Sequence, residues 1–176
     1  MRYLFFPLLL LTALIFACDD NGGTTTDESA RRGPTVIYLS RHAEKDSGND
    51  PNLLASGQQR ADRIAALLGG KNISAVYATG YKRTQQTAAP TARAAGVRVR
   101  NYSASKSASR LTERWVKRHR GETIYVVGHS NTVPGLVNAL IGEQRYGEIS
   151  HDEFGNLFKV TVEPGGAARV EELTSN

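Results

Sequence analysis

The stretch VIYLSRHAEK, residues 36–45, decides the fold, because it contains a buried strand that ends on two chemically active side chains. Val36 to Leu39 are apolar and β-prone, as in a strand that is covered on both faces of a sheet. The run then stops at Arg41 and His42, a cation beside an imidazole. A buried strand of this kind needs neighbouring strands and helices that cover it. The arrangement of those elements determines which other side chains lie near Arg41 and His42.

Strand and helix signals alternate from Pro34 onward. The expected strands cover residues 35–40, 73–78, 97–100, 123–128, 157–163 and 168–173, and the expected helices cover residues 56–70, 82–96, 107–121 and 132–142. Pro90 should kink the second helix or start a second piece. The alternation predicts an α/β fold with a mostly parallel sheet covered on both faces. Pro164-Gly165-Gly166 predicts a hairpin that gives the sheet a C-terminal antiparallel edge.

Residues 1–18 have the features of an export signal. Arg2 precedes an apolar run from Tyr3 to Ala17, which is shorter than the ~20 residues of a membrane span and fits the core of a secretion signal. The last four residues, Ile15-Phe16-Ala17-Cys18, resemble the bacterial lipobox, in which the cysteine is lipidated and becomes the mature N-terminus. An ordinary cleaved signal or an uncleaved anchor is the alternative.

Residues 19–33, DDNGGTTTDESARRG, are polar and lack apolar periodicity, which predicts a flexible tether. We therefore expect an exported protein, periplasmic or at the cell surface, that is tethered to a membrane through a lipid on Cys18. Residues 34–176 remain for folding, which is the size of one ordinary domain.

The net charge and the spacing of the histidines limit the kinds of ligand that we expect. The formal charge is +5, and the sequence has no long run of Lys and Arg. This charge is compatible with a small anionic ligand, with a polyanion, or with a surface that is merely basic, and we expect no nucleic acid partner. Histidines 42, 119, 129 and 151 lack the spacing of zinc ligands, so no metal or cofactor is expected. His119, in the basic stretch WVKRHRG, is expected to be solvated, and Trp115 to belong to the core.

Four functional side chains follow the predicted strands. Arg41 and His42 come after the first strand, Arg83 after the second, and His129 after the fourth. Ligands of parallel sheets bind at the carboxyl ends of the strands, so these side chains should meet at one edge. Two guanidiniums bind phosphate by paired hydrogen bonds, and they should lower the pKa of a nearby histidine, which keeps its ring neutral and nucleophilic. The set is suited to phosphoryl transfer without a metal.

At these residues the sequence resembles the histidine phosphatases, the phosphoglycerate-mutase-like superfamily. LSRHAEK, residues 39–45, matches the Arg-His-Gly signature of that family, with Ala43 in place of the usual glycine. VVGHSN, residues 126–131, matches the strand that delivers the second histidine of the family. The resemblance extends over residues 35–163.

Two further elements carry the same resemblance. DPNLLASGQQRA, residues 50–61, is similar to a helix start of the family, with Leu54 in place of the usual hydroxyl cap. YATGYKRTQQTA, residues 77–88, is similar to the family element that contains an arginine, with Thr79 in the serine position. Four such elements in the right order make a specific signal, although each one alone is weak.

The resemblance implies a three-layer α/β/α sandwich and a role for each residue of the site. His42 becomes the nucleophile that is converted to phosphohistidine, and Arg41, Arg83 and His129 form the phosphate pocket. Lys45 and Ser130 are further candidate substrate-binding residues.

The proton donor for the leaving group stays open. Many relatives have Glu or Asp after the third strand, but this chain has VRVRNYSASKS there, without a carboxylate. Glu44 is the first candidate for this catalytic role, and Asp46 and Asp50 are the others.

The sequence thus predicts a metal-independent phosphomonoesterase that acts on a phosphorylated small molecule or a phosphoprotein. A non-catalytic lipoprotein that binds a phospho-ligand is the alternative, since the usual acid is missing. A phosphoglycerate-type mutase would need longer insertions. A serine hydrolase could use Ser130 in GHSNT, but Thr132 replaces the final glycine of the Gly-x-Ser-x-Gly motif. Substrate specificity is expected to lie in residues 45–52 and 101–110.

Overall fold

The protein is described by a computed structural model, which describes residues 33–176. The predicted export signal, Cys18 and nearly all of the predicted tether therefore lie outside the described residues. Within residues 33–176, no helix is both long enough and apolar enough to span a bilayer.

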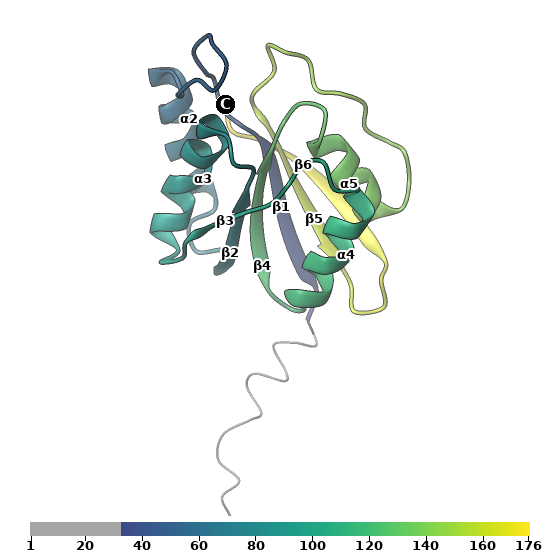
Figure 1. Cartoon of the computed structure of the whole chain (residues 1–176). Coiled ribbons are helices and arrows are strands. Elements are labelled where there is room, and N and C mark those ends of the chain that lie inside the picture. Colours follow the sequence, from purple (N-terminus) through teal and green to yellow (C-terminus); the bar gives the residue numbers. More distant parts are fainter. Residues whose placement is uncertain (1–32) are drawn as a thin grey trace, which may run out of the picture.

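Strands and helices alternate as the sequence predicts (Figure 1). The strands are β1 (Thr35–Arg41), β2 (Ile73–Ala78), β3 (Val99–Asn101), β4 (Thr123–Gly128), β5 (Asn156–Val162) and β6 (Ala168–Thr174). The helices are α2 (Ala55–Leu67), α3 (Lys82–Ala94), α4 (Ala108–Arg118) and α5 (Val133–Ile141).

One six-stranded sheet has the order β3-β2-β4-β1-β5-β6. The first four strands run parallel, and β5 and β6 add the predicted antiparallel edge. In the pairing of β1 with β4, Arg41 lies opposite Gly128, and the amide of His42 donates a hydrogen bond to the carbonyl of Gly128 at 3.0 Å. The two strands therefore end together, which places the residues that follow them side by side.

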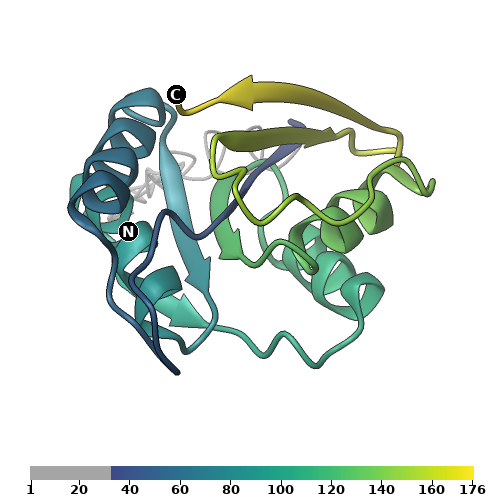
Figure 2. The ribbon, with the colours of Figure 1, turned by 90° about the horizontal axis from the view of Figure 1, so that it is seen from above.

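Helices cover both faces of the sheet, α2 and α3 on one side and α4 and α5 on the other (Figures 1 and 2). The alternation of side chains along β1 supplies both layers, since Ile37 and Leu39 belong to the core beneath α4 and α5 whereas Tyr38 belongs to the core beneath α2 and α3. The fold is thus the expected three-layer α/β/α sandwich, and Trp115 is buried in its core as predicted.

One alternative at Pro90 and the prediction for His119 are corrected. Helix α3 continues through Pro90, so the proline does not start a second piece, and the predicted kink stays a prediction. The helix tolerates this proline because proline removes only one backbone hydrogen bond and already has a helical φ. The helix ends four residues later, and its buried face packs on α2. His119 is buried rather than solvated, because its ring lies 2.9 Å from the Tyr77 hydroxyl and 2.7 Å from the Glu122 carboxylate.

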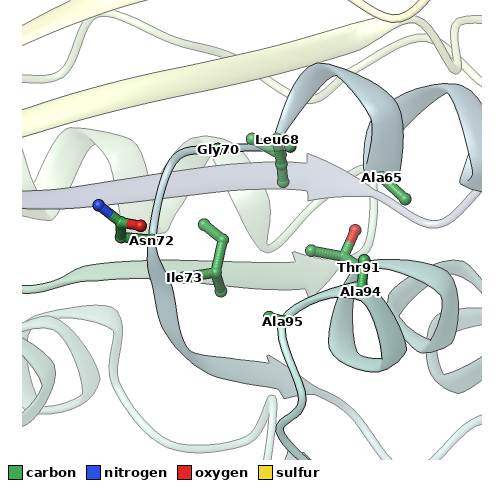
Figure 3. Close-up of a pocket in the computed structure, with 9 residues that line it drawn as sticks. Ala65, Leu68, Gly70, Asn72, Ile73, Thr91, Ala94 and Ala95 are labelled. Atoms are coloured by element: carbon green, nitrogen blue, oxygen red, sulfur yellow. The ribbon is translucent and has the colours of Figure 1, made fainter.

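A small cavity of about 260 Å³ lies between the ends of α2 and α3, beside the start of β2 (Figure 3). Leu68, Ile73 and several alanines give it a largely apolar lining, and the Thr91 hydroxyl has no hydrogen-bond partner. No titratable side chain lines this cavity, so the chemistry of the molecule has to be sought at the other end of the sheet.

Candidate active site

A cleft of about 490 Å³ lies at the carboxyl ends of β1, β2 and β4. The structure brings Arg41, His42, Arg83 and His129 together in its lining. The rings of the two histidines have their centroids 5.6 Å apart and are inclined at 67°. Segments that are far apart in sequence thus meet at one place because parallel strands end at one edge.

His42 presents a nucleophilic nitrogen in this cleft. Its Nδ1 lies 2.8 Å from the carbonyl oxygen of Ala43, and a carbonyl can only accept a hydrogen bond, so Nδ1 carries the proton. The lone pair is then on Nε2. Burial, together with the charges of Arg41 and Arg83, lowers the pKa of His42 to about 4, which keeps the ring neutral at physiological pH.

Hydrogen bonds fix the opposite proton position in His129. The Nη2 of Arg83 lies 3.4 Å from Nδ1, and a guanidinium only donates, so Nδ1 accepts and Nε2 carries the proton. Nε2 lies 2.9 Å from the Thr79 hydroxyl, which continues at 2.9 Å to the Thr84 hydroxyl. Burial and the charges of Arg83 and Arg41 lower the pKa of His129 to about 4.

Arg41 is buried and contacts four residues of the segment after α5. Its Nη1 donates to three backbone carbonyls in the segment after α5, at 2.8 Å to Ser150, 3.0 Å to His151 and 2.8 Å to Glu153. The guanidinium also lies over the Phe154 ring, 4.1 Å from its centroid. Its Nε has no partner in the described residues. Arg41 therefore holds residues 148–155 against the cleft while it remains part of the lining.

Arg83 is the second residue of α3 and is positioned from two sides. Its guanidinium lies 4.3 Å from the centroid of the Tyr81 ring, and its Nη1 lies 3.9 Å from an oxygen of Asp50. The same Asp50 oxygen accepts a hydrogen bond from the amide of Lys82 at 3.0 Å, which caps the start of the helix. Asp50 therefore positions Arg83.

Glu44 is not placed to protonate a leaving group, contrary to the prediction. Arg60 binds its carboxylate with Nε 3.0 Å from both oxygens and Nη2 2.7 Å from one of them, and Glu44 does not line the cleft. Burial raises the pKa of Glu44, but the hydrogen bonds from Arg60 outweigh burial and hold the pKa below its usual value. Nearness in sequence misled here because the chain turns after Ala43 and directs the next side chain toward α2.

Gly57 allows this turn to pack against α2. A Cβ atom at Gly57 would lie 2.1 Å from the carbonyl oxygen of Glu44, so only glycine fits this position. The same carbonyl accepts a hydrogen bond from the amide of Leu54 at 3.0 Å, which is the position where the family has a hydroxyl cap. Asp46 is exposed and lies outside the cleft lining.

Lys45 and Ser130 do line the cleft, as do several residues that the sequence did not indicate. Glu148 is the one carboxylate among the described residues that line it, and its Oε1 accepts a hydrogen bond from the Ser130 hydroxyl at 3.2 Å. Glu148 comes from the irregular segment after α5, which has no periodicity that could place it. Within residues 33–176, no three His, Cys, Asp or Glu side chains cluster as metal ligands.

Comparisons with known proteins agree with this geometry. Residues 37–106 match the family model of the histidine phosphatase superfamily, branch 1. No curated protein sequence matches the chain.

Solved structures share the fold at low sequence identity. The structure is similar to a mycobacterial glucosyl-3-phosphoglycerate phosphatase, with 12% identity over 81% of this chain and 100% of that chain and a TM-score of 0.67. It is similar to the protein histidine phosphatase SixA complexed with tungstate, with 15% identity over 80% and 97% of the two chains and a TM-score of 0.63. It is also similar to YhfR of Bacillus stearothermophilus, with 18% identity over 78% and 96% and a TM-score of 0.62.

The chain thus shares its three-layer α/β/α sandwich with these solved phosphatases, and it places two imidazoles and two guanidiniums at one edge of its sheet. The residues that match the histidine phosphatase family model, 37–106, include Arg41, His42 and Arg83 of this cleft.

Proposed function

We propose that the chain is a metal-independent phosphomonoesterase that acts through a phosphohistidine on His42. The observation that supports this proposal is the hydrogen bond from Nδ1 to Ala43, which leaves a lone pair on Nε2 beside two arginines. Nε2 attacks phosphorus, a P–N bond forms, and the P–O bond to the alcohol breaks. Water then cleaves the P–N bond, which releases inorganic phosphate and restores the imidazole.

The other three residues of the pocket hold the phosphoryl oxygens. Arg41 and Arg83 offer guanidinium donors that match a phosphate and neutralise its charge. A bound dianion favours the protonated imidazole, so His129 can take up a proton at Nδ1 and donate it to a phosphoryl oxygen. Each donor of this kind commonly contributes about 10²- to 10³-fold to the rate.

We assign the proton donor to Glu148. It shares the cleft with His42, whereas Glu44 is bound by Arg60 and Asp50 is held by the amide of Lys82. The alternative of a non-catalytic binder was based mainly on the missing acid after the third strand. A carboxylate in the cleft weakens that argument.

Replacing Glu148 by glutamine should slow hydrolysis according to the leaving group. Phenyl phosphate releases a phenol with a pKa of ~10 and needs a proton, so its kcat should fall about 10²-fold. 4-Nitrophenyl phosphate releases a more acidic phenol and should be affected far less. Steady-state kinetics on both esters measure the difference, with Glu153→Gln from the same segment as the control. An equal loss on both esters would argue against a proton donor at this position.

The phosphohistidine itself can be trapped. The protein is mixed with a ³²P-labelled phosphate ester, quenched within milliseconds in alkaline detergent and digested. We expect a label on the peptide that contains His42, stable to base and labile to acid. A label on Ser130 would have the opposite stability and would support the serine alternative. Turnover without an acid-labile label on His42 contradicts the proposal.

The substrate class that we propose is a phosphorylated small molecule or a phosphoprotein. Export and lipid anchoring through Cys18 stay predictions from the sequence.

A further inference from the structure

A second groove, of about 540 Å³, lies beside the cleft and is strongly basic. Four cationic side chains line it: Arg100, Lys106, Arg114 and Arg118. No carboxylate is among the residues that line it, and none of the four cations forms an ion pair in the part of the chain that the structure describes. A concentration of unpaired positive charge of this kind attracts anions.

The basic groove is built from the edge of the sheet and one face of a helix. Arg114 and Arg118 are one turn apart on α4, so they point the same way. The edge strand β3 supplies Arg100, whose Nη1 lies 3.5 Å from the Tyr77 hydroxyl and whose guanidinium is 5.9 Å from the centroid of that ring. The segment that follows β3 supplies Lys106.

The floor of the basic groove is aromatic but is not available for stacking. Trp115 and Tyr77 are only 2% and 7% exposed, and the Tyr102 ring meets Trp115 edge-on, with the centroids 5.3 Å apart. Trp115 and Tyr77 therefore offer no free ring face to a nucleobase, and the four cations make negative charge the main property by which the groove selects a ligand.

The basic groove and the cleft share their dividing wall. Gly80 lines the groove and Tyr81 lines the cleft, and in the same way Ser103 lines the groove and Ala104 the cleft. The Tyr102 hydroxyl donates to the carbonyl of Val127 at 3.3 Å, two residues before His129. One extended molecule can therefore reach both sites.

We propose that the basic groove is a second anion subsite, which selects phosphate esters that carry a further phosphate or carboxylate group. This inference rests on the proposed function, since the phosphate that is hydrolysed sits at His42. The second anionic group lies against Arg114 and Arg118 and is not itself hydrolysed at that place. It identifies the preferred substrate as a compound with two separated anionic groups.

The test compares bisphosphates of linear diols, in a series of increasing chain length, with the monophosphates of the matching alcohols. At the length that spans the two sites, the bisphosphate should have a KM about 10-fold below that of its monophosphate. The double variant Arg114→Gln/Arg118→Gln should lose this advantage while the kcat and the monophosphate KM stay unchanged. Lys71→Gln/Arg93→Gln removes the same charge from exposed positions elsewhere and should keep the advantage.

Two outcomes overturn the subsite: no chain length gives a bisphosphate an advantage, or both double variants lose it equally. Turnover of the monophosphates reports on the cleft alone. Calorimetric titration with the bisphosphates needs no turnover, so it tests the basic groove even if His42 proves not to be the nucleophile. Weaker binding of the bisphosphate by Arg114→Gln/Arg118→Gln then supports the subsite, and unchanged binding contradicts it.

Discussion

Replacement of His42 by asparagine is expected to lower kcat on phenyl phosphate by about 10⁴-fold or more, because the variant has no nitrogen lone pair to attack phosphorus. Asparagine is close to histidine in size and its amide N–H can still face the Ala43 carbonyl, which Nδ1 approaches to 2.8 Å. The loss should therefore reflect chemistry and not a collapse of the strand end. Steady-state kinetics at saturating substrate measure it.

A second measurement separates the nucleophile from the fold. Arg41 and Arg83 remain in the variant, so inorganic phosphate should still raise its melting temperature, as it does for any anion bound by the native state alone. His151→Asn is the matched control, since His151 lines the same cleft without a part in the proposed chemistry, and it should keep most of the activity. A His42→Asn variant within 10-fold of the parent would remove the basis for a phosphohistidine.

The second large effect is expected from Arg41→Lys, with a loss of about 10³-fold in kcat/KM. An ammonium group keeps the charge but loses the planar fork that grips a phosphate. Its single nitrogen also cannot serve both a phosphate and the carbonyls of Ser150, His151 and Glu153, which Nη1 binds in the parent protein, so these acceptors lose their donor when the ligand is held. The variant should therefore also loosen the segment that carries Glu148.

Hydrogen exchange distinguishes the two roles of Arg41. Amides of residues 148–155 should exchange faster in Arg41→Lys than in the parent protein. Arg83→Lys serves as the control, because Arg83 contacts Tyr81 and Asp50 and not this segment, so it should lose activity without faster exchange there. If exchange in residues 148–155 is unchanged in Arg41→Lys, the arginine does not hold the segment in solution.

Most of the fold follows from local patterns. Strand β2 has the predicted bounds, and β4 does as well, because short apolar runs between polar turns have one stable place, in the middle of the sheet. The effect of Pro90 depends on the packing of α3 on α2, which no local rule contains. The burial of His119 has a related cause: its neighbours in sequence are cations, but its partners in space are Tyr77 of β2 and Glu122 of the turn before β4.

In the site, too, the residues that follow strands could be predicted from the sequence, and the residues of irregular segments could not. Arg41, His42, Arg83 and His129 follow strands, so the direction of the sheet brings them together before any side-chain detail is known. Glu148 and Phe154 lie in an irregular segment, and their position depends on the hydrogen bonds from Arg41 to backbone carbonyls that carry no sequence signal. The pairing of Glu44 with Arg60 depends on the packing of α2 against the turn after β1, which no local pattern in the sequence contains.

Because both histidine rings are neutral in the free protein, the binding of an anion is coupled to the uptake of protons. In the free protein, burial and the charges of the guanidiniums hold both histidine pKa values at about 4, but a dianion between the guanidiniums offsets their repulsion and moves these pKa values upward. Since the complex then retains more hydrogen ions than the free protein over the intervening pH range, association takes hydrogen ions from solution and tightens as the medium becomes more acidic. The heat of association should accordingly vary with the ionisation enthalpy of the buffer.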